Sequence, residues 1–507
     1  MAPAASSDGR RPAPAYWLTR FAFLRMLGLV YTVAFAILVL QGEALLGSRG
    51  LLPVADHLAQ LLRDHGRGSE AFLQAPTLFW LSASDAWLRA AGWLGLGLSL
   101  ALLLGLANAP LLALLWLLYG SYVHVGQIFY GYGWDILLLE TGFLAIFLAP
   151  LWRLGPFPRR SPPSFVVIVL LRWLTLRLML GAGLIKLRGD PCWRDFSCML
   201  FHYETQPNPN PLSWYFHHLP VWFHQLEVLG NHAVELVAPL FVFGPRPLRR
   251  AAGLSIIGFQ VLLILSGNLA FLNWLTIAVA IACLDDAVLR RLVPKPWLAR
   301  LDASVSGARA GRASRVAGLA LAAVVAVLSV SPVSNLVSRH QSMNAGFDPF
   351  FLVNTYGAFG RITRERFEIV LEGTADEPHD PAARWVAYEF PCKPGAPERR
   401  PCWISPYHLR LDWQMWFLAM PERARDRWFL HLVSRLLAGD AATRRLLAPG
   451  PFETEPPRAI RAQYYAYRFT HPGESAWWER RLVSAYLPPL TRDDPRLVEA
   501  LRRSGWR

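Results

Sequence analysis

Residues 21–40 read FAFLRMLGLVYTVAFAILVL, and this run decides the class of fold. As a helix, 20 residues rise about 30 Å, which is the thickness of the hydrocarbon core of a bilayer. A signal peptide has a shorter apolar core and a cleavage site of small residues, whereas this run contains Arg25 and lacks a clear site of that kind. We therefore expect a retained membrane span at about 18–40.

The composition of the whole chain also predicts a membrane protein. Of its 507 residues, 53% are hydrophobic and only 17% are charged, and 21 are tryptophans. Further apolar runs follow the first at lengths suited to transmembrane helices. We expect about nine such helices, at roughly 18–40, 87–107, 110–129, 134–150, 165–187, 228–244, 249–266, 268–285 and 314–332.

The formal net charge of +15 is distributed in a way that predicts orientation. Much of the excess lies in the N-terminus and in the loops at 151–164, 245–250 and 286–313, which fall on one side of the membrane. Because Lys and Arg are retained on the cytoplasmic side, the loops 41–86 and 188–227 and the C-terminal region are expected outside. The arginines form no single basic domain, so we expect contact with the lipid bilayer and none with nucleic acid.

After about residue 334 the apolar residues alternate with polar ones instead of forming continuous runs. The chain is therefore predicted to be a polytopic α-helical membrane protein: residues 1–334 form a multi-pass transmembrane domain, and 335–507 form a C-terminal extramembrane α+β domain. Pro421 and Pro495 mark expected helix starts. Strands of a mostly antiparallel sheet are expected in FEIVLE (367–372), WVAYEF (385–390) and HLRLDWQM (408–415).

The cysteines raise a question about the stretch GDPCWRDFSCMLFHYETQPNPNP, at 189–211. Cys192 and Cys198 lie in this stretch, and Cys392 and Cys402 bracket a second short loop. All four fall on the predicted outer side, in a lumen or periplasm where disulfides persist. We expect the disulfides Cys192–Cys198 and Cys392–Cys402, each closing a small loop.

A metal or reactive-cysteine site is an alternative interpretation of the same stretch. Histidines lie nearby at His202, His217, His218, His224 and His232. However, the gap between the two cysteines is wider than in zinc motifs, and no second cysteine pair lies close in sequence. No phosphate loop, nucleophile elbow, HExxH or dinucleotide fingerprint is present, so we expect no catalytic, cofactor-binding or metal-binding residues.

Charged residues inside the predicted spans are costly unless they are paired. Helix direction and depth place Glu140 near Arg177, and Asp135 near Lys186 at the outer rim. We expect these four residues to form intramembrane ion pairs that lock helix packing. A catalytic or transport role for them is the alternative.

Four long motifs in order resemble the lipase maturation factor family. They are LLGSRGLLPV (45–54), YGWDILLLETGFLAIFL (132–148), GLIKLRGDPCWRDFSCMLFHYETQPNPNPLSWYFHHLP (183–220) and VNTYGAFGRITRERFEIVLEGT (353–374). The resemblance covers nearly the whole chain. It implies a multi-pass protein that helps secreted homodimeric lipases, such as lipoprotein lipase, reach their active assembly at the endoplasmic reticulum membrane. In a bacterial member, which the short loops and Arg- and Ala-rich composition would suit, the membrane is the inner one.

The first functional hypothesis is thus a membrane-anchored maturation factor, or chaperone, for secreted lipases or other exported clients. We expect it to act as a folding factor more than as an enzyme, and to need no cofactor. Its client surface is expected on the two loops closed by disulfides and on the 41–86 loop. The second is an integral-membrane enzyme, because the spans distantly resemble the vitamin K-dependent carboxylase group. Its candidate residues lie near the outer rim, at Lys186, Asp190, Arg194, Asp195 and Glu204. A transporter is the third, although no repeat symmetry is visible.

Overall fold

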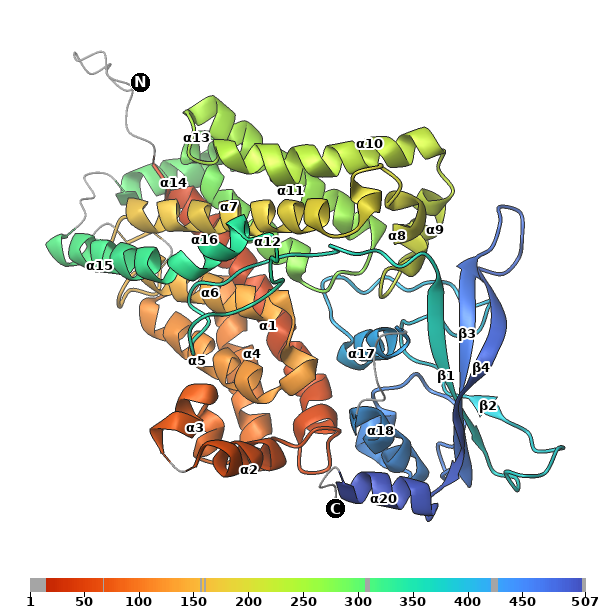
Figure 1. Ribbon diagram of the computed structural model, residues 1–507. Helices are drawn as coiled ribbons and strands as arrows, with labels where there is room; N and C mark the ends of the chain where they lie inside the picture. The colour runs from red at the N-terminus through yellow and green to blue at the C-terminus, as the bar shows by residue number, and fades with distance from the viewer. Residues whose placement is uncertain are drawn as a thin grey trace, which may run out of the picture.

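A computed structural model describes residues 15–66, 68–155, 157–158, 161–305, 311–420 and 427–503. Figure 1 shows a helical part and, beside it, a sheet, with two helices, α17 and α18, between them. The helical part contains α1 (Trp17–Leu46), α4 (Asp85–Leu104), α5 (Ala109–Val125), α6 (Gly133–Leu148), α7 (Phe165–Arg188), α10 (Val221–His232), α11 (Arg246–Ser266), α12 (Leu272–Ala280), α15 (Arg312–Leu328) and α16 (Val330–Val337).

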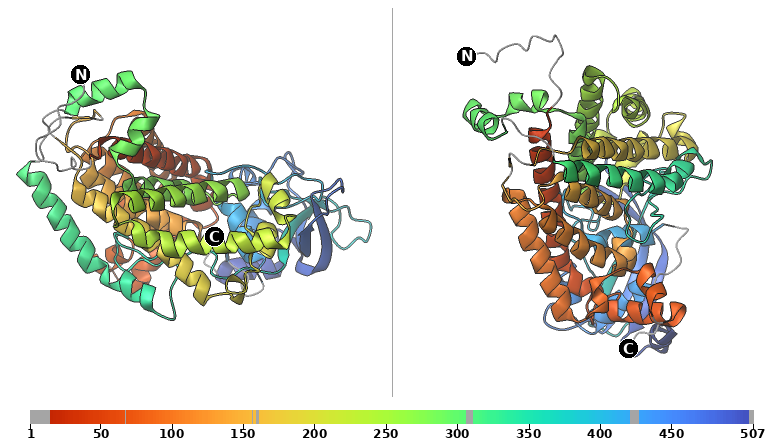
Figure 2. Two further views of the ribbon diagram at one scale, coloured as in Figure 1. Left: turned by 90° about the horizontal axis from the view of Figure 1, so that it is seen from above. Right: turned by 90° about the vertical axis from the view of Figure 1, so that its left-hand side faces the viewer.

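Shorter helices connect or flank these longer ones. They are α2 (Val54–His65), α3 (Ser69–Gln74), α8 (Met199–Thr205), α9 (Pro211–His217), α13 (Asp286–Leu289) and α14 (Lys295–Val305). In the view from above, α15 lies at one end of the molecule and the strands lie at the other (Figure 2).

Each predicted span coincides with helical structure, but not every helix is long enough to cross a bilayer. Among the residues that the structure describes, four helices qualify alone by length and composition, namely α1, α4, α7 and α11. The number rises to six if each of two bent pairs is one span. One bent pair runs through α12 and α13 with an angle of 108°, and the other is α15 with α16 at 41°.

The predicted span at 228–244 is interrupted. Helix α10 ends at His232, a π-helical turn covers Ala233–Val237, and a 3-10 turn covers Ala238–Phe241. Pro239 lies in the second turn and lacks the amide hydrogen that a continuing α-helix needs. The apolar run therefore forms an α-helix followed by π-helical and 3-10 turns, and not one continuous α-helix.

The second and third predicted spans are separated by a tight turn and form two helices. Gly105 adopts a φ of 123°, a conformation that glycine adopts readily, and ends α4. Three residues later, the Asn108 side chain accepts a hydrogen bond from the amide of Leu111 and caps α5. Helix α1 packs against α4 so closely that a Cβ on Gly28 would lie 2.7 Å from the Leu103 nitrogen.

The C-terminal region contains one four-stranded antiparallel sheet with strand order β2-β1-β3-β4. The sheet is flanked by helices, with α17 packed on β1 and α18 on β3. The elements are β1 (Arg366–Thr374), β2 (Val386–Ala387), α17 (Arg410–Leu418), α18 (Arg427–Leu437), α19 (Ala441–Arg444), β3 (Ala459–Phe469), β4 (Trp478–Thr491) and α20 (Pro495–Arg503).

Two of the three predicted strands in this region are present, and one prediction was wrong. FEIVLE lies in β1 and WVAYEF contains β2, whereas HLRLDWQM leads into helix α17. Alternating polar and apolar residues predict a strand with one exposed face. Here both kinds of residue are buried, and Arg410 and Asp412 are fully buried beside Leu411. The helix starting at Pro495 is present, and Pro421 lies outside the described residues.

A buried ion pair joins the sheet region to the helical bundle. Arg410 at the start of α17 donates to both carboxylate oxygens of Asp135 on α6, at 2.9 and 3.0 Å. It also donates to the carbonyl of Phe129, and both charged side chains are fully buried. Beside this pair, Gln41 of α1 accepts from the Arg410 amide and donates to the carbonyl of His408. Polar contacts from α17 therefore fix two bundle helices, and one apolar core runs through both parts.

Replacing Arg410 with Ala should lower the free energy of unfolding by about 3–5 kcal/mol, because it leaves the Asp135 carboxylate buried without a partner. The neutral double variant Asp135→Asn/Arg410→Gln should recover much of this loss. The exposed pair Arg290–Asp302 supplies a control, since Arg290→Ala should cost less than about 1 kcal/mol. Denaturant unfolding of the purified full-length protein in detergent measures all three variants. A loss below 1 kcal/mol for Arg410→Ala would contradict the structural role of the pair.

Candidate functional site

The predicted partner of Glu140 is the one that the structure shows. Glu140 on α6 pairs with Arg177 on α7, and both side chains are buried. Glu140 also accepts hydrogen bonds from the Tyr356 hydroxyl at 2.7 Å and from the Asn354 amide at 2.9 Å, while Arg177 donates to the Asn354 carbonyl. The cluster fastens the segment after the last helix of the bundle onto α6 and α7, which is a structural use of both charges.

The pairing of Asp135 with Lys186 was wrong. Asp135 binds Arg410, and the Lys186 ammonium lies 2.6 and 2.7 Å from the two carboxylate oxygens of Glu235. Asn231 accepts from Lys186 at 2.8 Å and donates to Glu235. The depth of a residue along a predicted span could not identify the partner of Asp135, because that partner, Arg410, lies 275 residues away in sequence.

The structure contains both predicted disulfides, Cys192–Cys198 and Cys392–Cys402. Cys192, Cys198 and Cys392 are buried. Within the described residues, no group of three or more His, Cys, Asp or Glu side chains is placed to hold a metal ion.

The stretch at 189–211 is mostly buried between the bundle and the sheet. Arg366 of β1 donates to the backbone carbonyls of Glu204, Gln206 and Pro207, and it is held in place by Glu368 at 2.6 Å. Trp193 donates to the carbonyl of Phe359 from the first part of the stretch. The stretch is therefore a joint between the two parts, and little of it is available as a client surface.

The residues of the enzyme hypothesis do not converge on one site. Asp190 pairs with Arg364 at 2.7 Å and caps the following turn, and Arg194 donates to the carbonyl of Leu187. Asp195 accepts from Ser197. Glu204 accepts from the backbone of Phe469 and lies 3.5 Å from His217. Of the five candidates, Lys186 alone lines the cavity described next.

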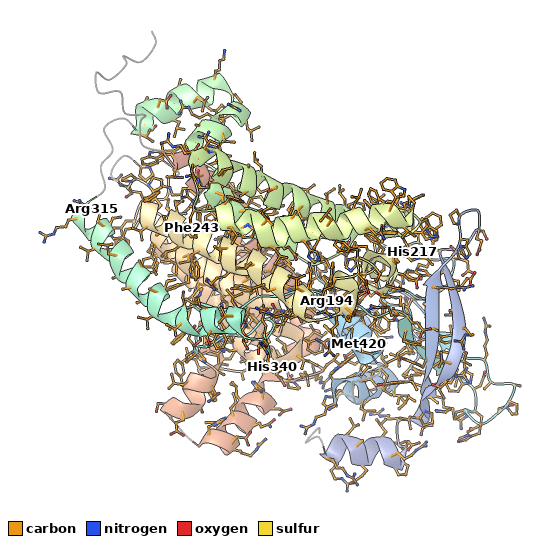
Figure 3. All side chains as sticks on the ribbon, turned by 45° about the horizontal axis from the view of Figure 1, so that its top comes forward. Arg194, His217, Phe243, Arg315, His340 and Met420 are labelled. Atoms are coloured by element: carbon orange, nitrogen blue, oxygen red, sulfur yellow. A yellow bond between two sulfur atoms is a disulfide. The ribbon has the colours of Figure 1, made fainter. Side chains whose placement is uncertain are left out.

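A cavity of about 1210 Å³ lies at the junction of the bundle and the sheet region. This volume exceeds the roughly 300–1,000 Å³ of common ligand pockets. Figure 3 labels His340 and Met420, which line the cavity from the segment after α16 and from the end of α17. Its walls are largely apolar and come from α7 (Leu178, Ala182, Ile185), α10 (Phe223, Leu226), α11 (Phe259, Leu262, Leu263) and α17 (Trp413, Trp416, Phe417).

A few polar groups interrupt the apolar walls. The Lys186–Glu235 pair forms one, and Asn273 donates to Gln260 at 2.8 Å to form another. The Oδ1 atom of Asn273 and the Nδ1 atom of His202 are buried and accept or donate no hydrogen bond within the described residues. Few convergent polar groups in a large apolar cavity are typical of a ligand-binding site.

Three buried histidines that lie outside the candidate membrane-spanning helices have lowered pKa values. Burial lowers the pKa of His202 to about 3 and that of His217 to about 4, and it lowers the pKa of His431 to about 4. Burial acts in the opposite direction on carboxyls and raises the pKa of Asp412 to about 6, although two backbone amides hydrogen-bond to it. The histidines are therefore neutral in the folded protein at neutral pH.

These shifts predict how acid affects stability. An unfolded histidine binds a proton below about pH 6.5, and folded His202 does not, so its contribution to stability is lost as the pH falls below 6.5. His202→Phe should reduce the loss of stability between pH 7.5 and 5.5 by about 1 kcal/mol. The exposed His340 provides the control variant His340→Phe, and unfolding of each protein at the two pH values is the measurement. An unchanged pH dependence in the His202 variant would contradict the assignment.

Comparison with known proteins assigns the chain to a family. A family model described as the Lipase maturation factor transmembrane domain matches residues 18–291, and one described as the Lipase maturation factor C-terminal domain matches residues 352–488. No solved structure matches the chain.

Curated relatives match over nearly the full length. Lipase maturation factor 1 of Bos taurus is 50% identical over 512 residues, which cover 96% of this chain and 91% of the relative. Lipase maturation factor 1 of Homo sapiens is 46% identical over 99% of this chain and 94% of its own length. Lipase maturation factor 2 of Homo sapiens is 32% identical over 96% and 85%, respectively. The chain belongs to the lipase maturation factor family.

Proposed function

We propose that this protein is a membrane-embedded maturation factor for secreted homodimeric lipases, such as lipoprotein lipase. The observation that carries the proposal is the identity of 46–50% with Lipase maturation factor 1 proteins over nearly the whole chain. The geometry agrees with a binding role, because the candidate catalytic residues are dispersed and engaged in structural contacts. No observation favours the carboxylase-like alternative.

The client surface that the geometry supports best is the free edge of β4. Within the described residues, this 14-residue strand ends the sheet and pairs with β3 on one side only, and Figure 1 shows it at the outer side of the sheet. Leu482 and Val483 on this strand are 52% and 43% exposed. A free edge can bind an extended segment of another chain through backbone hydrogen bonds. An incompletely assembled lipase would offer such a segment.

We further propose the finer topology: nine spans, a cytoplasmic N-terminus, and residues 335–507 in the lumen of the endoplasmic reticulum. The basic loops and the two outer disulfides support the orientation, and the animal relatives support the compartment. The boundary near residue 334 then separates the membrane part from the outer part. It does not separate two independently folding units, because Arg410 needs Asp135.

Lipase maturation should be restored when the wild-type protein is expressed in cells that lack their own lipase maturation factors. The double variant Leu482→Lys/Val483→Lys should restore much less, because lysines block pairing at a strand edge. Val498→Lys on α20 is the control, since Val498 is similarly exposed. The measurement is secreted lipoprotein lipase activity per mass of lipase synthesised. No rescue by the wild type would refute the function, and equal rescue by all variants would refute the β4 surface alone.

Glycosylation tests the topology, because the sequence contains no native Asn-x-Ser/Thr acceptor. The pair Ala382→Asn/Arg384→Thr creates one in an exposed loop of the outer part, and Arg312→Asn creates one at the first residue of α15. In mammalian cells the first protein should carry a glycan that endoglycosidase removes, and the second should carry none. A glycan only on the second would reverse the proposed orientation.

A further inference from the structure

The wall of the large cavity has open space, here called the gap, beside two glycines, one on α10 and one on α11. Gly230 of α10 and Gly258 of α11 line the cavity, and a Cβ added to either would meet no atom within 4 Å. Glycines in membrane helices commonly serve close packing of helices, and these two do not. Their absent side chains instead leave the wall open.

The gap lies beside exposed apolar side chains of α10 and α11. Leu226 and Leu262 line the cavity and are still 54% and 57% exposed, so the same residues form its inner wall and its mouth. Leu229 and Leu265 extend this exposed apolar surface along the two helices. Because helices that cross a membrane present such faces to lipid, an apolar molecule can enter the cavity sideways from the bilayer.

The depth of the cavity suits a long hydrocarbon chain. Its wall on α11 extends from Ser255 to Ser266, a rise of about 16 Å at 1.5 Å per residue. On α7 it extends from Leu178 to Arg188, about 15 Å by the same measure. Each methylene group buried along such a wall contributes about 0.8 kcal/mol to binding.

Three arginines line the cavity near the C-terminal end of α7. Arg188 ends α7, and Arg339 and Arg361 join it in the cavity lining; the last two are exposed. In the part of the chain that the structure covers, neither Arg339 nor Arg361 has a carboxylate within salt-bridge distance. Asn273 also lines the cavity, and its buried Oδ1 atom, which has no hydrogen-bond partner within the described residues, can accept from a ligand hydroxyl or amide.

We propose that the cavity binds a lipid with a long acyl chain and an anionic head group. The chain lies along α7 and α11, and the carboxylate or phosphate of the head group lies at Arg188, Arg339 and Arg361. This site goes beyond the proposed action on lipases, since it requires no client. The head group chemistry is common to free fatty acids and to anionic phospholipids, and the two sources are distinguished by experiment.

Photocrosslinking of the full-length protein in nanodiscs tests the proposal. Three probes carry a diazirine in the acyl chain: a fatty acid, a phosphatidylglycerol and a phosphatidylcholine. At equal mole fraction, at least one anionic probe should label peptides from α11 and α17 at least five times more than phosphatidylcholine does. Labelling by the fatty acid alone or by phosphatidylglycerol alone identifies the source.

Variants locate the site. Gly258→Trp should fill the mouth and reduce labelling at least five-fold, and Gly97→Trp on α4 is the matched control, because a Cβ on Gly97 also meets no atom within 4 Å and Gly97 does not line the cavity. Arg339→Glu/Arg361→Glu should remove the preference for anionic probes. Gly230→Trp provides an independent test if Gly258→Trp lowers the melting temperature. Equal labelling by all three probes, or equal labelling of the Gly258 and Gly97 variants, would overturn the proposal.

Discussion

The interaction on which the architecture depends is the buried pair between Asp135 and Arg410. Removing two charges from water costs several kcal/mol per ion, and the cost is offset only by close mutual contact and further hydrogen bonds. Both are present here: Arg410 binds both oxygens of Asp135 as well as the Phe129 carbonyl, and Asp135 also accepts from the Tyr119 hydroxyl. Neither part of the protein can satisfy its charge without the other. The bundle and the sheet region therefore form one body.

Three further contacts reinforce this joint at separate places. Glu140 and Arg177 hold the segment at Asn354, Arg366 holds the buried stretch near Gln206, and Asn268 binds the loop closed by the second disulfide through the Cys402 carbonyl. All of them connect helices of the bundle or the loops between those helices to the C-terminal region. These contacts hold the β4 edge at a fixed position relative to the bundle, which suits the proposed role of holding a client during assembly.

Much of this fold could be predicted from sequence, because its signals are local. The apolar runs predicted the helices, and the placement of four cysteines on one predicted side of the membrane predicted the two disulfides. The opposite charges at similar depth in neighbouring helices predicted the pair of Glu140 with Arg177. The partner of Asp135 could not be found this way, since nothing local connects it to a residue 275 positions later. Strands β3 and β4 were both missed, although AIRAQYYAYRF of β3 is rich in aromatic residues that favour strands. The cavity has no sequence signal, because its lining comes from many separate segments.

The proposed lipid site and the proposed client surface lie on different parts of this single body, so binding at one does not block the other. That arrangement holds only if α17 stays docked on α6. Hydrogen exchange of the full-length protein in detergent tests this most directly. We expect amides of residues 411–418 to exchange as slowly as those of α6 in the wild type, and Asp135→Asn to speed the exchange of residues 411–418 at least ten-fold. Fast exchange of α17 in the wild type, independent of α6, would contradict it.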